Sequence, residues 1–272
     1  MSSLMYFLSS GKYKRLLTTE KYLEVLRERI RHYQETTGHE RVEWSEQGVV
    51  GKFMNFRKYE YDEVGLKEFL DERGLLPVVS TVKWKDLSVD AQESIGEFNS
   101  TIREDMKFIP NAEMRMKKDE VEDYKRKIHN LNIDDLVCRW KETKDEYKSL
   151  SKLWDWICLN SPAVLSNPDQ YKKYGTVLSI RPDPIIDAVH VFKCLGSNSF
   201  MKHCKVQEDL VIQYGLKGYY SLKETRKFRI LTGIQTKYYL MDLHEETRIR
   251  DMLDNKLRRY SIISQLETNG GN

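Results

Sequence analysis

The segment from Ile133 to Leu159 constrains the fold of this chain most strongly. Apolar or partly apolar residues recur along it at alternating steps of three and four, which keeps one face of an α-helix apolar over nearly four heptads. This seam consists of Ile133, Leu136, Trp140, Thr143, Tyr147, Leu150, Trp154 and Ile157. Such a helix is about 40 Å long at 1.5 Å per residue, so it must bury the seam against neighbouring helices or a second copy of itself. Because Trp156 and Leu159 extend the apolar surface around the last turns, we expect that end to be buried, with Trp154 and Leu150 almost fully enclosed.

The composition of the chain is that of a folded, helix-rich protein. Its 272 residues are 40% hydrophobic and 32% charged, with only six prolines and 14 glycines. This length suits one large or two modest domains, and the scarcity of proline and glycine favours helices over a strand-rich sandwich. The net charge of +3 divides into −1 for residues 1–131 and +4 for residues 132–272. The asymmetry points to a polyanionic partner for the C-terminal half.

We therefore predict an α+β fold that is mainly α with a small β element, organised by the long central helix. Three regions follow along the chain: a mixed N-terminal region (1–131), the central helix (132–160) and a helical, basic C-terminal domain (161–272). The stretch 161–175 contains two prolines and reads as an irregular connection, which makes it the expected domain boundary.

The N-terminal region contains a strand–helix–strand unit with clear local signals. Val49–Tyr61 is rich in β-branched and aromatic residues, as strands are. Asp62 is placed to cap the following helix, and Gly74 stands where a left-handed C-cap belongs. Val78–Trp84 is expected to return as a second strand, and the sequence leaves open whether the two strands pair.

Three more helices are predicted before the central one. The first is capped by Thr18 or Thr19, and the second begins at Ser88 and carries apolar positions through to Met106. The third is highly charged, covers about 112–131 and ends at a joint near Asn132. An antiparallel hairpin with the central helix and a continuous bent helix are both compatible with this joint.

The C-terminal region contains a pattern that resembles a helix-turn-helix between residues 221 and 243. Ser221 and Glu224 form a capping box, Gly233 marks a turn, and a second helix is expected to follow. Basic residues in and after this segment are candidates for phosphate contact, and Tyr238 is a candidate for stacking on an unpaired base. The candidate nucleic-acid-binding residues are Lys223, Arg226, Lys227, Arg229, Lys237, Tyr238, Arg258 and Arg259.

Catalytic and metal chemistry find little support in the sequence. Asp187 and His190 lie three residues apart on a predicted helix, but no nucleophile or oxyanion donor accompanies them, so a structural histidine is favoured. Cys194, His203 and Cys204 lack the short paired spacing of zinc sites, and no phosphate-binding loop or hydrolase motif is present. We predict no cofactor, no metal and no catalytic residues.

The cysteines and the N-terminal segment indicate the cellular compartment of the protein. The four cysteines form no CxxC pair, and the apolar run Leu4–Leu8 is too short for a signal peptide or a membrane span. We therefore expect a cytoplasmic protein with free thiols.

Three hypotheses for function follow. The first is a non-enzymatic nucleic-acid-binding protein for DNA or RNA, in which a homodimer through the 133–157 seam is possible. The second is a protein–protein interaction adaptor or inhibitor that makes no nucleic-acid contact, and the third, an enzyme, has the least support. Basic residues clustered with exposed tyrosines would favour the first hypothesis, and basic residues scattered among acidic neighbours would favour the second.

Overall fold

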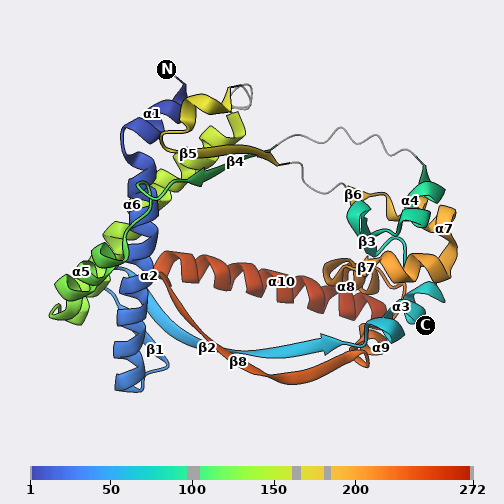
Figure 1. Cartoon of the computed structure of the whole chain (residues 1–272). Helices are drawn as coiled ribbons and strands as arrows, with labels where there is room; N and C mark the ends of the chain where they lie inside the picture. The colour runs from blue at the N-terminus through green and yellow to red at the C-terminus, as the bar shows by residue number, and fades with distance from the viewer. Residues whose placement is uncertain (1, 97–104, 161–166, 181–184, 270–272) are drawn as a thin grey trace. The chain divides into compact units, whose positions relative to one another are not determined.

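The computed structural model describes residues 2–96, 105–160, 167–180 and 185–269, and it leaves out the side chains of residues 105, 185, 256, 257 and 259–269 (Figure 1). Its fold is α+β, as predicted: helices predominate and the strands form small antiparallel sheets. The chain divides into two compact units, which differ from the sequence-based regions because each unit combines distant segments. The first unit comprises Met1–Met54, Arg103–Arg181 and Thr236–Asp251, and the second comprises Asn55–Ile102, Pro182–Gln235 and Met252–Asn272.

The elements are as follows. The first unit holds α1 (Ser3–Ser9), α2 (Lys12–Thr37), β1 (Arg41–Trp44), β4 (Asp105–Pro110), α5 (Lys118–His129), α6 (Ile133–Asn160), the 3-10 helix η3 (Pro168–Tyr171) and β5 (Gly175–Ile180). The second unit holds α3 (Glu63–Asp71), β3 (Ser80–Lys83), the 3-10 helix η1 (Trp84–Asp86), α4 (Val89–Ile95), β6 (Ile185–Ile186), α7 (Ala188–His203), β7 (Lys205–Val206), α8 (Glu208–Leu216) and α9 (Leu222–Arg226). Three elements contribute residues to both units: β2 (Val49–Tyr61), β8 (Arg229–Asp242) and α10 (Leu243–Asn269).

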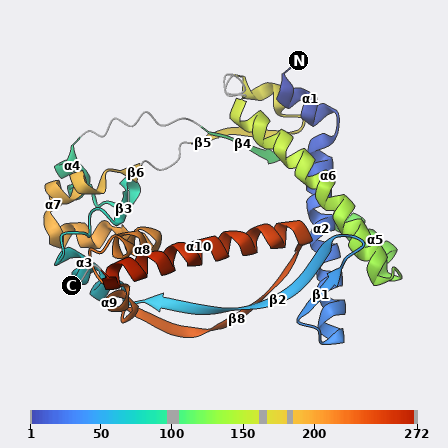
Figure 2. The same ribbon diagram turned by 180° about the vertical axis from the view of Figure 1, so that it is seen from behind.

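The predicted central helix is α6, and its seam packs inside the first unit. Leu136, Val137 and Trp140 share a core with Leu26 and Ile30 of α2, and Figure 2 shows α6 crossing α2. The other end of the seam meets α1 and β4 in a second core, where Trp154 contacts aromatic rings. Self-association through this seam would therefore require α2 to separate from α6.

The expectation for the end of α6 is wrong. Trp154 and Leu150 are only partly buried, and Trp156 and Leu159 are 53% and 57% exposed. The core around Phe7 and Ile157 packs against one side of this helix end.

Several local predictions agree with the structure. Asp62 caps α3 by accepting a hydrogen bond from the Gly65 N–H at 3.0 Å, and Gly74 adopts a positive φ of 65° after the helix. The two predicted strands are β2 and β3, which do not pair with each other: β2 lies between β1 and β8, and β3 lies between β6 and β7. The Asn132 side chain accepts from the Asp135 N–H at 2.8 Å, which separates α5 from α6.

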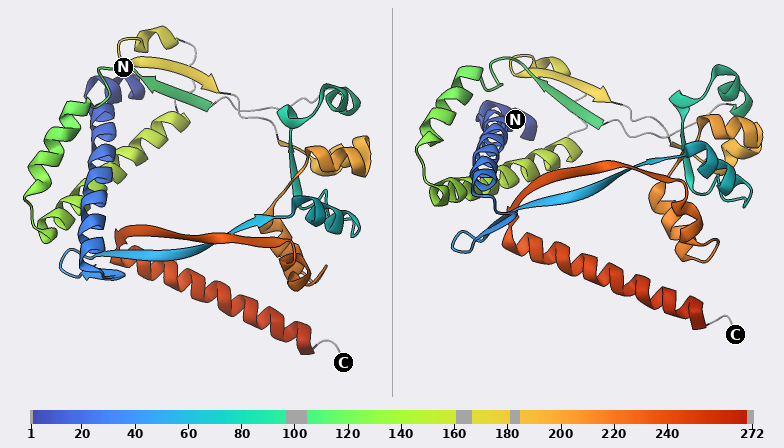
Figure 3. Two further views of the ribbon diagram at one scale, coloured as in Figure 1. Left: turned by 60° about the horizontal axis from the view of Figure 1, so that its bottom comes forward. Right: turned by 90° about the horizontal axis from the view of Figure 1, so that it is seen from below.

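Three predicted helices have different limits in the structure, and the one expected over about 112–131 is α5, which runs from Lys118 to His129. The first begins after Gly11, and Thr18 and Thr19 lie inside it with their hydroxyls bonded to carbonyls of the preceding turn. The Ser88-capped helix ends at Ile95, and Met106 lies in strand β4 because that segment pairs with β5, the arrangement visible in Figure 3. Residues 97–104, which the predicted helix included, lie outside the described residues.

The helix-turn-helix prediction is wrong. The capping box of Ser221 and Glu224 is present, but α9 has only five residues and the expected second helix is the 14-residue strand β8. Gly233, taken as a turn, lies within that strand. The β-branched and aromatic residues of 229–242 find a partner strand in β2, and this long-range pairing decides their conformation. The C-terminal region is consequently not purely helical.

Candidate functional site: a basic ribbon and the pocket at its end

The predicted site residues are divided between the two units. Lys223, Arg226, Lys227 and Arg229 are exposed on α9 and at the start of β8, within the second unit. Lys237 is exposed on the part of β8 that belongs to the first unit, and Arg258 is exposed on α10. The side chain of Arg259 lies outside the described residues.

Tyr238 is a core residue, which contradicts its predicted role as a stacking platform. Its ring is buried 4.9 Å from the Phe53 ring, and its hydroxyl lies 3.3 Å from Gln34 Oε1, to which it donates. Burial raises the pKa of this hydroxyl. The neighbouring Tyr239 is partly buried.

The second unit contains a two-stranded ribbon made of residues 55–61 of β2 and 229–235 of β8. β1 accompanies β2 only as far as Phe53, whose N–H donates to the Glu40 carbonyl, so the ribbon beyond it has two strands in the described part of the chain. The Thr232 hydroxyl donates to the Lys58 carbonyl across the ribbon at 3.4 Å. Most of its side chains are exposed, including the apolar residues Phe56, Ile230, Leu231 and Ile234.

Basic and aromatic side chains share one face of this ribbon. The Arg229 guanidinium lies 4.4 Å from the centre of the Tyr59 ring and 5.6 Å from that of Tyr61. Alternate residues of a strand point to the same side, so Arg57 belongs to the face of Tyr59 and Tyr61, and Lys58 belongs to the other. Arg57 and Lys58 form no ion pair with any described residue.

A pocket of about 380 Å³ lies where the ribbon ends. Its lining comes from β2, α3, β7, α8, α9 and β8. The lining residues are Tyr61, Glu63, Leu66, Lys67, Lys205, Val206, Gln207, Glu208, Val211, Thr225 and Arg229. The volume is within the range of roughly 300–1,000 Å³ found for small-molecule sites.

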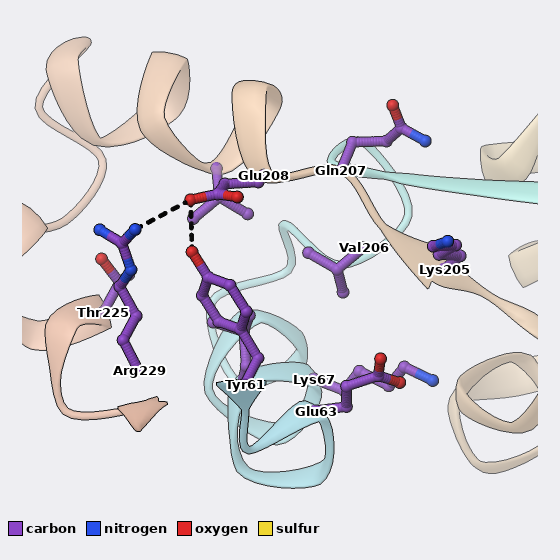
Figure 4. A pocket seen from close by; sticks show the side chains of 11 residues that line it. Tyr61, Glu63, Lys67, Lys205, Val206, Gln207, Glu208, Thr225 and Arg229 are labelled. Atoms are coloured by element: carbon purple, nitrogen blue, oxygen red, sulfur yellow. Dashed lines mark hydrogen bonds and ion pairs between the residues drawn. The ribbon is translucent and has the colours of Figure 1, made fainter. Parts of the chain in front are cut away.

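Glu208 is the centre of one side of this pocket. Its Oε1 accepts the hydroxyl hydrogen bond of Tyr61 and pairs with the Arg229 guanidinium at 3.3 Å, as the dashed lines in Figure 4 mark. Burial, followed by this hydrogen bond, raises the pKa of Tyr61 to about 12, so the hydroxyl stays protonated near neutral pH. Tyr61 is consequently a hydrogen-bond donor here and lacks the lowered pKa of an activated base.

Sequence reasoning found Arg229 but missed Arg57, Lys58, Tyr61 and Glu208. The run Phe56–Tyr61 holds three aromatic residues with Arg57 and Lys58 among them, inside a correctly predicted strand, and that signal was available. The partnership of Tyr61 with Glu208 was not available, because 147 positions separate the two residues.

A second charged cluster lies in the first unit at the junction of β8 and α10. Asp242 accepts hydrogen bonds from Lys141, Lys144 and Lys148 of α6. Burial alone raises the pKa of Asp242, but the hydrogen bonds from the lysines outweigh it and hold the pKa well below its usual range.

Glu246 repeats this arrangement one turn into α10. It is buried and pairs with Arg41 at 2.9 Å and Lys52 at 2.7 Å. The hydrogen bond from Arg41 is the main cause of its pKa of about 2. Both carboxylates are fully engaged by cations, which indicates a role in fixing the start of α10.

The other candidate chemistry is not assembled. The Asp187 carboxylate caps α7 by accepting from the Val189 N–H at 3.0 Å, and His190 is exposed with its Nε2 3.7 Å from Cys194 Sγ. Cys204 is buried, and His203 Nδ1 lies 2.9 Å from the Asp86 carbonyl. Among the described residues, no group of three histidine, cysteine or acidic side chains is arranged to hold a metal ion.

The comparisons with known proteins identify no relative. No protein-family model, curated protein or solved structure matches this chain. In the described ranges, none of the helices combines the length and the apolar character needed to cross a bilayer.

Proposed function

We propose that this chain is a non-enzymatic nucleic-acid-binding protein that uses the β2–β8 ribbon, together with α9, as its contact surface. The observation that carries the proposal is the exposed two-stranded ribbon with Arg57, Lys58 and Arg229 on it. A two-stranded β-ribbon is one of the two elements that the major groove of duplex DNA admits. Exposed cations on both of its faces suit phosphate contacts on the two sides of a groove.

Helix α9 adds charge next to the ribbon. Lys223 and Arg226 are exposed there, and the Lys227 ammonium lies 4.8 Å from the centre of the Phe228 ring, just before β8. Arg229 stays beside Tyr59 while it pairs with Glu208, so the partly exposed guanidinium keeps donors for an incoming phosphate. Glu208 and Glu60 reduce the net charge of this surface without cancelling it.

The test is binding of labelled duplex and single-stranded oligonucleotides, measured by fluorescence anisotropy between about 50 and about 200 mM salt. We expect affinity to fall steeply with salt, because phosphate contacts release counterions. Arg57→Gln/Lys58→Gln should weaken binding to all sequences and reduce the slope of log K against log salt by about two.

The matched control is Lys193→Gln/Lys202→Gln. It removes the same charge from exposed positions of α7 in the same unit, and binding should stay near that of the wild type. Equal losses in both double variants would mean that net charge, and not the ribbon, determines binding. If the wild-type protein binds neither duplex nor single strands at low salt, the proposal is refuted.

A protein partner is the second candidate, and helix α10 favours it. Ile249, Met252 and Leu253 are exposed at helical spacing and form an apolar stripe. A pull-down from native lysate, with and without nuclease, separates the candidates. A partner protein retained after nuclease and lost in Met252→Glu/Leu253→Glu would support the adaptor function.

A further inference from the structure

The pocket at the end of the ribbon has two chemically different ends. Tyr61 and Arg229 both bind Oε1 of Glu208, and in Figure 4 the other carboxylate oxygen lies on the side away from Arg229. A carboxylate offers about four lone-pair positions, so Oε2 can accept a hydrogen bond from a ligand. This end of the pocket therefore suits a hydrogen-bond donor.

The opposite end is cationic. Figure 4 places Lys67 and Lys205 on the far side of the pocket from Arg229. The Lys67 ammonium donates to the Met201 carbonyl at 2.8 Å and keeps two further N–H donors, and Lys205 is exposed. Glu63 lies beside Lys67 and balances one of the two charges, which leaves a cationic excess of one at this end.

The middle of the pocket is apolar. Val206 lies between the two ends in Figure 4, and Leu66 and Val211 complete the apolar lining. A matching ligand carries an N–H donor at one end, a flat apolar body in the middle and an acidic group at the other end. A nucleotide whose base bears an exocyclic amino group has this order of groups, and carboxylates accept from such amino groups in base recognition.

We propose that this pocket binds one unpaired nucleotide with an exocyclic amino group. Its base lies over Val206 with the amino group on Glu208, and its phosphate lies at Lys67 and Lys205. The inference rests on the proposed function, since the natural occupant is an unpaired nucleotide of the nucleic acid that the ribbon contacts. A base that presents a carbonyl oxygen to Glu208 is disfavoured, because two acceptors then face each other.

The test uses three probes and isothermal titration calorimetry. Cytidine 5′-monophosphate should bind, and uridine 5′-monophosphate, which replaces the amino group by a carbonyl, should bind about tenfold or more weakly, the effect of losing one hydrogen bond to a charged group. Cytidine without phosphate should also bind more weakly. Lys205→Gln should reduce the affinity for cytidine 5′-monophosphate but not for cytidine.

Glu208→Gln tests whether the Glu208 carboxylate binds the amino group of the base. It should remove the preference for the cytidine over the uridine nucleotide, with a thermal melt confirming that the variant folds. If it does not fold, the comparison of the three probes on wild-type protein still decides. Equal binding of the cytidine and uridine nucleotides, or no binding of either at millimolar concentration, overturns the inference.

The ribbon function and the nucleotide pocket can be refuted independently of each other. Arg57→Gln/Lys58→Gln should weaken the binding of oligonucleotides and leave the binding of the cytidine nucleotide unchanged. Binding of strands without binding of any mononucleotide would overturn the pocket assignment alone. Binding of the mononucleotide without binding of strands would overturn the ribbon function and leave a nucleotide site.

Discussion

Replacing Asp242 by asparagine tests whether its carboxylate stabilises the junction of β8 and α10. The side chain is 13% exposed and lies 2.8 Å from the Lys144 ammonium and 3.2 Å from that of Lys148, and it also bonds to Lys141. Asn keeps the shape and removes the charge. The three ammonium groups then lose their common counterion.

The size of the effect follows from the exposure of the lysines. Lys141 and Lys148 are 33% and 47% exposed, so both can turn toward water. Lys144 is 14% exposed and keeps Glu245 at 3.0 Å, with the centre of the Trp140 ring 4.7 Å from its ammonium. Removing one partner of a buried pair costs about 3–5 kcal/mol, and because Lys144 retains one carboxylate we expect a loss of about 2–3 kcal/mol.

Urea unfolding followed by tryptophan fluorescence measures this loss. Trp44, Trp140, Trp154 and Trp156 belong to the first unit and only Trp84 to the second, so the signal reports mainly on the unit that contains Asp242. Lys148→Gln is the control, with an expected cost below about 1 kcal/mol for a half-exposed partner. A change within about 0.5 kcal/mol in Asp242→Asn, or equal costs in both variants, would refute the reasoning.

Two further predictions concern the first unit. The pKa values of Asp242 and Glu246 are lower in the folded protein than their ordinary values of 3.8 and 4.5, so the stability that these carboxylates supply is complete above the ordinary values and is lost as the pH falls through the pKa values of the folded protein. The urea midpoint of the wild-type protein should therefore decline below about pH 4.5, and it should decline more shallowly in Asp242→Asn/Glu246→Gln. Parallel declines in the two proteins would contradict this prediction. Trp154→Ala should lower the free energy of unfolding by about 2–3 kcal/mol, because the ring contacts Phe7, Tyr13 and Phe108. The loss is smaller than for a fully buried aromatic residue, because the ring is only partly buried. An unchanged urea midpoint would show that this ring does not stabilise the core.

Elements whose signals are local could be predicted from the amino-acid sequence. Asp62 and Gly74 mark the two ends of α3 because capping depends on residues within one helical turn. The 3–4 spacing of the seam likewise predicted the helix now seen as α6, Ile133–Asn160. A segment whose own residues supply both the helix cap and the periodic apolar face can be predicted as a helix without knowledge of its distant contacts.

The conformation of residues 229–242 and the position of the site depend on contacts between distant parts of the chain. Gly233 and the capped helix before it suggested a second helix, but pairing with β2 made the segment a strand. The same pairing placed Arg229 beside Tyr59 and Tyr61, and it buried Tyr238 against Phe53. These contacts join residues more than 160 positions apart, and strand formation depends on the neighbour that satisfies the backbone hydrogen bonds, which no local pattern specifies.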